Sequence, residues 1–157
     1  MERVATLTVI ALSRARHRLR FPERVVAMAD RMRTLLVEDE DDIRFVVELA
    51  LAHRSNFDLT SFASGVEALE ALSEGGPSFD LALVNLNLPA MSGATFAKRM
   101  ASLPCCADTP VIFVTASLYG RDEAQLRGGN SIGVITKPFD AVALPDQIRD
   151  MLEQTRV

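Results

Sequence analysis

The stretch DLALVNLNLPAMSG, residues 80–93, decides the fold class of this chain. It opens with an apolar run, Leu81–Leu86, that has the length and composition of a fully buried β-strand. The residues that follow, with Pro89, Ser92 and Gly93 among them, are typical of a loop. A strand that is apolar on both faces belongs in a sheet covered on both sides, which is the environment of parallel sheets flanked by helices.

The same alternation extends outward from this stretch in both directions. Apolar, β-prone runs predict four further strands, over Thr34–Val37, Phe57–Phe62, Val111–Thr115 and Ile132–Thr136. Apolar residues at helical spacing predict a helix after each strand, over residues 41–51, 65–72, 96–103, 121–126 and 144–152. Strands that alternate with helices indicate an α/β domain with a central five-stranded parallel sheet. Such doubly wound sheets bind their ligands at the carboxyl ends of the strands.

The composition is that of one ordinary globular domain, with 157 residues, 48% hydrophobic and 24% charged. No apolar run is long enough to span a bilayer. The apolar run over residues 4–12 precedes the arginines of residues 14–20, which is the reverse of a secretory signal, so we expect a cytoplasmic protein. Cys105 and Cys106 are adjacent, which is not zinc-ligand spacing and is typical of two ordinary thiols in a reducing compartment.

Residues 1–31 differ from the rest of the chain in charge. They contain seven arginines and three acidic residues, whereas the remaining residues contain ten basic and eighteen acidic ones. An acidic body argues against nucleic acid as a partner. We interpret residues 1–31 as an N-terminal extension of a domain over residues 32–157. Two hypotheses for the extension stay open: a misassigned start, with translation beginning at Met28 or Met32, or a basic tail that binds a membrane or a partner.

Polar residues gather where the predicted strands end. They are the acids of residues 38–42 after the first strand, Asn85 and Asn87 at the third, Thr115 at the fourth and Lys137 at the fifth. Each alone has an ordinary explanation, such as a solvated acidic helix start or a surface lysine. Together they would bring carboxylates, an amide, a hydroxyl and an ammonium group to one edge of the sheet. Carboxylates suit a hard cation such as Mg²⁺, and a hydroxyl with a lysine suits oxyanions, so the set predicts a site for a phosphoryl group.

Four motifs in this order resemble those of a known family, the receiver domain of bacterial response regulators. They are LLVEDE at residues 35–40, DLALVNLNLP at 80–89, PVIFVTA at 110–116 and TKPF at 136–139. The resemblance covers nearly all of residues 32–155. It implies a flavodoxin-like (βα)₅ fold, a role in two-component signal transduction, and a phosphoryl group passed from a histidine kinase to an aspartate.

The resemblance also assigns roles to individual residues. It implies that Glu38 and Asp39 are the acids that bind Mg²⁺, with the Asn87 backbone carbonyl as a further metal ligand. It implies that the Thr115 hydroxyl contacts a phosphoryl oxygen and that Lys137 pairs with the phosphoryl group. The proline that follows this lysine matches the usual cis-proline of the family.

Asn85 departs from the family, because it stands at the position of the phosphorylated aspartate. A carboxamide is neutral and its nitrogen lone pair is delocalised, so Asn85 cannot form the acyl phosphate that a carboxylate forms. The metal site also loses one negative ligand, and we expect Mg²⁺ to bind weakly at most. Val134 is a second departure, since many receivers have an aromatic residue there that moves with the hydroxyl residue. Without an acceptor, Lys137 beside Glu38 and Asp39 can equally be a structural ion-pair network.

We therefore predict a stand-alone, atypical receiver that is not an enzyme. This pseudo-receiver would act through protein–protein contacts, independently of phosphorylation, with a histidine kinase, a phosphotransferase or another regulator as partner. The family's usual docking face comprises the fourth helix, the fifth strand and the fifth helix, here roughly Leu118–Leu152. We expect no DNA-binding module after the last helix, which ends near Glu153. The alternative is a phosphorylatable receiver that uses another acid, such as Asp39, or an aspartate in place of Asn85 through deamidation or in the true gene sequence.

Overall fold

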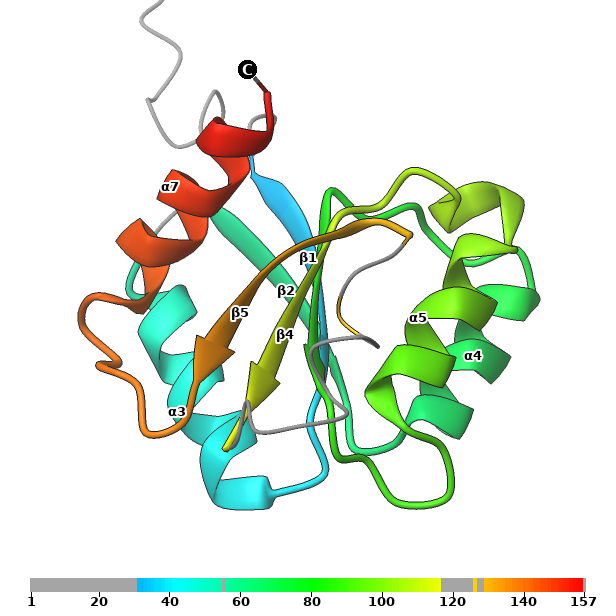
Figure 1. The fold of residues 1–157 in the computed structure, drawn as a ribbon, viewed down its shortest axis with the longest axis horizontal. Coiled ribbons are helices and arrows are strands. Elements are labelled where there is room, and N and C mark those ends of the chain that lie inside the picture. Colours follow the sequence, from blue (N-terminus) through cyan, green and yellow to red (C-terminus); the bar gives the residue numbers. More distant parts are fainter. Residues whose placement is uncertain (1–30, 55, 117–125, 127–128, 157) are drawn as a thin grey trace, which may run out of the picture. The chain divides into compact units, whose positions relative to one another are not determined.

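A parallel sheet of five strands runs through the middle of the domain, in the order β2-β1-β3-β4-β5 (Figure 1). The structure, a computed structural model, describes residues 31–54, 56–116, 126 and 129–156. The strands are β1 (Met32–Val37), β2 (Phe57–Phe62), β3 (Leu81–Asn85), β4 (Val111–Thr115) and β5 (Ser131–Thr136). The helices are α3 (Asp41–Ala52), α4 (Gly65–Ser73), α5 (Gly93–Ala101), the short 3₁₀ helix η1 (Pro104–Cys106) and α7 (Leu144–Thr155). None of the described helices is both long and apolar enough to cross a membrane.

Strand β3 explains why the sheet is covered on both faces. All five of its residues are buried. Leu81 and Leu83 pack in the core on the side of α3 and α7, whereas Ala82 and Val84 pack in the core on the side of α4 and α5 (Figure 1). Burying a leucine side chain stabilises a fold by about 1.5–3 kcal/mol, so a strand of this kind is stable only with a helical layer on each side. The predicted doubly wound α/β fold with a parallel five-stranded sheet is therefore confirmed.

The strand order sets the position of the site. The chain passes from β1 to β2 on one side and then to β3 on the other, so the carboxyl ends of β1 and β3 lie at the switch point of the sheet. Val37 of β1 is paired with Val84 of β3. The residues that follow this pair, Glu38 and Asn85, are thus next in register at the same edge of the sheet.

Helix α5 differs most from its predicted boundaries. It begins at Gly93, although apolar spacing predicted a helix over residues 96–103 with Gly93 in the preceding loop. The cause is a helix cap: the Ser92 hydroxyl accepts a hydrogen bond from the Thr95 backbone N–H at 3.2 Å. Such a cap fixes the first turn without any apolar residue, so the apolar pattern could not locate it.

The other boundaries lie close to the predicted ones. Strands Phe57–Phe62 and Val111–Thr115 are as predicted, β1 and β5 begin slightly earlier, and β3 ends at Asn85, one residue earlier. The helix predicted over residues 121–126 lies outside the described residues except for its last one. The interpretation of residues 1–31 as an extension stays a prediction, because all but the last of them lie outside the described residues too.

Gly93 permits the close approach of α5 to the end of β3. A Cβ atom at position 93 would lie 2.2 Å from the Asn85 carbonyl oxygen and 2.9 Å from Leu86 Cα, and neither backbone atom can rotate away. We expect Gly93→Ala to lower the free energy of unfolding by about 1–3 kcal/mol, measured by urea denaturation. Gly133→Ala is the control, because its Cβ would meet the flexible Met151 side chain at 3.0 Å. Equal losses in the two variants would contradict this explanation.

Candidate functional site

The predicted site residues lie together at the carboxyl edge of the sheet. Glu38 and Asp39 follow β1, Asn85 and Thr115 are the last residues of β3 and β4, and Lys137 follows β5. Thr115 is fully buried, and its backbone carbonyl accepts a hydrogen bond from the Lys137 backbone N–H at 2.7 Å. The peptide bond after Lys137 is cis, as the family resemblance implied. The strand-end pattern therefore located these residues correctly, while their roles stay predictions.

The Asn85 side chain bridges the two acids that follow β1. Its amide nitrogen Nδ2 donates to Glu38 Oε1 at 2.9 Å and to Asp39 Oδ1 at 2.9 Å. Its oxygen Oδ1 accepts from the Asn87 backbone N–H at 3.0 Å. A reversed amide would turn its oxygen toward two carboxylates and its NH₂ toward a backbone donor, so the hydrogen-bond partners fix its orientation. With both N–H groups and the oxygen engaged, and 4% of the residue exposed, Asn85 is a buried and fully bonded amide.

Lys137 compensates the buried charge of Glu38. Its ammonium group lies 3.0 Å from Glu38 Oε2 and 3.1 Å from Glu40 Oε1. Burial lowers the pKa of Lys137, but its hydrogen bonds to Glu38 and Glu40 and the charges of these two groups outweigh burial, so its pKa is raised above the ordinary value. The Glu38 side chain is 2% exposed and that of Lys137 is 11% exposed. A buried carboxylate needs such partners, because an unpaired buried charge is strongly destabilising.

The acidic block after β1 divides into two groups. Glu38 and Asp39 belong to the site, whereas Asp41 and Asp42 lie exposed in the first turn of α3. Acids in a first turn are stabilised by the N–H groups and the dipole of their own helix. For Asp41 and Asp42 the ordinary interpretation, a solvated acidic helix start, is therefore correct.

The side chains, as arranged, do not fit a divalent cation. Mg²⁺ needs free carboxylate oxygens in a near-octahedral shell. Here Glu38 Oε1 and Asp39 Oδ1 converge on the Asn85 NH₂ group, which is a donor and cannot be a ligand. Among the described residues, no group of three or more His, Cys, Asp or Glu side chains is placed to hold a metal. The role predicted for the Asn87 carbonyl as a metal ligand stays a prediction.

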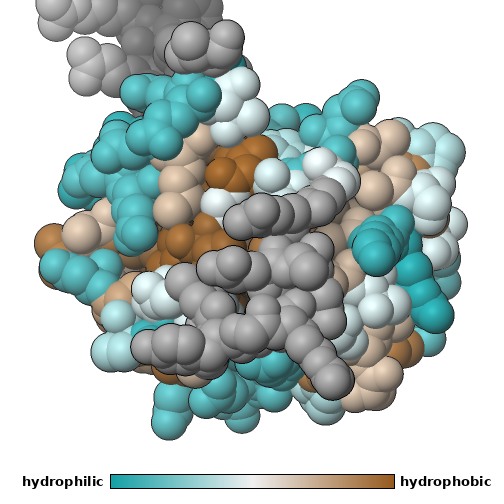
Figure 2. All heavy atoms as spheres, in the orientation of Figure 1, coloured by the Kyte–Doolittle hydropathy of each residue, from teal (hydrophilic) through white to brown (hydrophobic). Residues whose placement is uncertain are grey.

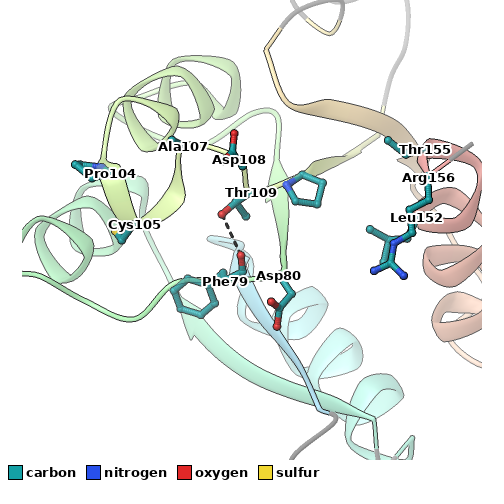
Figure 3. Close-up of a pocket in the computed structure, with 11 residues that line it drawn as sticks. Phe79, Asp80, Pro104, Cys105, Ala107, Asp108, Thr109, Leu152, Thr155 and Arg156 are labelled. Carbon is teal, nitrogen blue, oxygen red and sulfur yellow. Dashed lines mark hydrogen bonds between the residues drawn. The ribbon is translucent and has the colours of Figure 1, made fainter.

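A hollow lies at the opposite edge of the sheet, near η1 and the end of α7 (Figure 3). Its polar side chains do not converge, since the carboxylates of Asp80 and Asp108 point in opposite directions (Figure 3). Asp80 is paired with Arg33: burial raises the pKa of Asp80, but the hydrogen bonds from Arg33 outweigh burial and lower it overall. Thr109 donates its hydroxyl to the Phe79 carbonyl at 3.0 Å. The hollow thus presents paired groups and no set of side chains suited to one ligand.

The two cysteines lie on η1 and are free thiols, as predicted. Cys105 is half-buried and lines the hollow, and its sulfur lies 3.5 Å from that of Cys106. Burial, with the hydrogen bond to Cys105, raises the pKa of the Cys106 thiol to about 11.

Exposed apolar side chains mark a surface that the sequence interpretation missed. Phe45 and Leu49 on α3 and Val142 in the loop before α7 are 63%, 49% and 80% exposed. A groove between α3 and this loop is lined in part by Val46, Leu49 and Val142. The sequence contained a signal for this surface. Only Val47 and Leu51 of α3 are buried in the core, and the helix carries further apolar residues outside that stripe. On the described part of the predicted docking face, apolar surface is visible between α7 and β5, while the outer side of α7 is hydrophilic (Figure 2).

Comparisons with known proteins agree with this fold and this order of motifs. A family model for the response regulator receiver domain matches residues 34–149. The chain is 32% identical over 127 residues to the transcriptional regulatory protein CseB of Streptomyces coelicolor, covering 81% of this chain and 52% of that protein. It is 30% identical over 132 residues to the sensor kinase CckA of Brucella abortus, covering 84% of this chain and 14% of that protein. The chain thus spans about half the length of CseB and a smaller part of CckA.

Among solved structures, the domain is similar to the chemotaxis response regulator CheY4 of Vibrio cholerae. The TM-score is 0.69 at 23% sequence identity, over 77% of this chain and 98% of that chain. A CheY-like protein from Methanospirillum hungatei gives a TM-score of 0.69 at 22% identity, over 80% of this chain and 97% of that chain. These likenesses show the fold.

Proposed function

Because this chain belongs to the family of response regulator receiver domains, which act in two-component signalling, we propose that it is a pseudo-receiver whose output does not depend on phosphorylation. Members of the family are generally signalling modules rather than enzymes, and they typically bind Mg²⁺ in an acidic pocket. In the proposal, Asn85 stands at the position of the phosphorylated aspartate, and the acids and lysine around it serve to hold the fold.

The observation that carries the proposal is the bonding of Asn85. Phosphorylation of a receiver needs a carboxylate oxygen that attacks phosphorus and forms an acyl phosphate. The Asn85 oxygen belongs to a neutral amide and accepts a hydrogen bond from the Asn87 backbone N–H at 3.0 Å. Its nitrogen carries a delocalised lone pair and directs both hydrogens at carboxylates. Neither atom of the side chain is available as a nucleophile.

The rival proposal, phosphorylation of Asp39, has less support. Asp39 Oδ1 already accepts a hydrogen bond from Asn85 Nδ2 at 2.9 Å. Attack by this oxygen would require the bond to break, and transfer to either oxygen of Asp39 would place a phosphoryl group beside the Glu38 carboxylate, which binds the same amide nitrogen. The phosphoryl group and the Glu38 carboxylate are both negatively charged, and neighbouring like charges repel each other strongly where solvent screens them little.

The partners in the proposal are proteins of the same signalling class: a histidine kinase, a phosphotransferase or another regulator, in the cytoplasm. The contact would use the face that includes β5 and α7, where apolar surface lies beside a hydrophilic helix face (Figure 2). Two relatives support this class, because one is named a transcriptional regulatory protein and another a sensor kinase. A mixed apolar and polar surface is typical of contacts between proteins that also exist apart.

The test compares wild type with Asn85→Asp in radiolabelled acetyl phosphate and Mg²⁺. We expect no stoichiometric labelling of wild type, and labelling of the aspartate variant as a base-labile acyl phosphate. Stoichiometric labelling of wild type would overturn the proposal, and Asp39→Asn would then show whether Asp39 carries the label. Intact mass of wild type establishes beforehand that position 85 is an amide.

A further inference from the structure

We propose that the Asn85 carboxamide excludes divalent cations by occupying the cation position between Glu38 and Asp39. The site is then closed by a neutral hydrogen-bond donor, and does not merely lack one negative charge. This inference rests on the proposed function only in taking Glu38 and Asp39 as the family's metal-binding acids.

The first support is the position of the amide nitrogen. It lies 2.9 Å from Glu38 Oε1 and 2.9 Å from Asp39 Oδ1, so it stands between the two oxygens that a bridging cation would use. Mg²⁺ binds oxygens at about 2.0–2.1 Å and demands a regular shell of them. A cation on these two oxygens would therefore collide with the NH₂ group, and the amide would have to leave first.

The second support is that the amide is held at both ends. Its oxygen accepts from the Asn87 backbone N–H at 3.0 Å, which fixes the side chain against rotation. Glu38 Oε1 also accepts from the Glu40 backbone N–H at 3.2 Å, and Glu38 Oε2 pairs with Lys137 at 3.0 Å. Displacing the amide would cost hydrogen bonds to charged groups, each about 1.5–3 kcal/mol.

The local charge would by itself favour cation binding, so it separates the two explanations. The Lys137 ammonium group pairs with the carboxylates of Glu38 and Glu40. Asp39 adds a third carboxylate on the other side of the Asn85 amide, so these four side chains keep a net negative charge. Coulomb attraction alone would still draw a divalent cation to this edge of the sheet. Charge and occupancy therefore predict different outcomes for the same variants, and the two can be separated.

The experiment measures Mn²⁺ binding to the full chain, by the loss of the free Mn²⁺ electron paramagnetic resonance signal. Asn85→Ala removes the donor and leaves the charge of wild type unchanged. Ala63→Asp adds one negative charge at an exposed position directly after β2, at the same edge of the sheet, and keeps the Asn85 amide. If occupancy is decisive, we expect Asn85→Ala to bind Mn²⁺ at least about tenfold more tightly than wild type, and Ala63→Asp to stay within about threefold of it.

Two results would overturn the inference. One is an Asn85→Ala affinity equal to that of wild type while Ala63→Asp binds more tightly, since charge would then be decisive. The other is Mn²⁺ binding by wild type as tight as that of Asn85→Asp, which is measured alongside as the variant with a carboxylate at this position. If Asn85→Ala does not fold by circular dichroism, Asn85→Ser replaces it, because its short hydroxyl cannot span both carboxylates, and the same two results apply.

The failure of this inference is distinguishable from that of the proposed function. Tight Mn²⁺ binding by wild type would contradict the exclusion of cations, but position 85 would still lack the carboxylate that accepts a phosphoryl group. Labelling of wild type by acetyl phosphate would remove phosphorylation independence, whatever the Mn²⁺ affinities are.

Discussion

Asn85→Asp is expected to lower the free energy of unfolding by about 3–5 kcal/mol in the presence of a chelator. The substitution removes both hydrogen bonds from the amide to Glu38 and Asp39 and places a third carboxylate against them. Mg²⁺ should reverse part of this loss, because a cation that binds the folded state at 100 times its Kd stabilises it by about 2.7 kcal/mol. Urea denaturation of both proteins, with chelator and with Mg²⁺, measures these changes, and wild type should not respond to Mg²⁺.

Ala63→Asp is the matched control for this prediction. It adds the same charge directly after β2, at the same edge of the sheet, where the side chain is exposed. Its effect should stay within about 0.5 kcal/mol, as for most surface substitutions. A loss as large as that of Asn85→Asp would mean that added charge, and not the lost amide bridge, destabilises the domain. Mg²⁺ stabilisation of wild type would contradict the exclusion of cations by the amide.

Lys137→Met is expected to lower the free energy of unfolding by about 3–5 kcal/mol, measured by urea denaturation at pH 7. Methionine keeps most of the aliphatic stem but removes the ammonium group that pairs with the 2% exposed Glu38 side chain. The stabilisation of the folded state by the charged Lys137 should be complete below the ordinary lysine pKa of 10.5. It should be lost as pH rises through the higher pKa of Lys137 in the folded protein. The difference between wild type and variant should therefore be constant at neutral pH.

The control for Lys137 is an exposed ion pair. Arg54 lies 3.3 Å from Asp146, and their side chains are 44% and 54% exposed. Arg54→Met should cost at most about 1 kcal/mol, because solvent screens such pairs. If Lys137→Met cost no more than Arg54→Met, the ion pair with Lys137 would not be what stabilises the buried Glu38 carboxylate.

The sequence predicted the sheet well because its central strands are unambiguous. Val111–Thr115 and Leu81–Asn85 are buried throughout, so burial on both faces appears directly as an uninterrupted apolar run. The start of α5 depends on the Ser92 hydroxyl and leaves no apolar pattern, so the sequence predicted it too late. The strand ends were informative for a geometric reason: in a parallel sheet they all lie at one edge, whatever the lengths of the connections.

The bonding within the site could not be predicted in the same way. The amide bridge joins Asn85 to Glu38 and Asp39, which lie 47 and 46 positions away in the chain. Spacing along the chain says nothing about which hydrogen a side chain directs at which oxygen. Asn87 is a further example, since the family resemblance assigned its carbonyl to a metal, whereas its N–H fixes the orientation of the Asn85 amide.

The two thiols of η1 offer a practical route to follow this protein. With a pKa of about 11, Cys106 is ionised in roughly one molecule in ten thousand at pH 7 and should resist alkylating reagents. Cys105 is the more accessible of the two sulfurs and lines the hollow at the edge of the sheet opposite Asn85. A fluorophore attached there through a maleimide would leave the amide bridge unmodified, so the native sequence already carries a labelling position at the edge of the sheet away from Asn85.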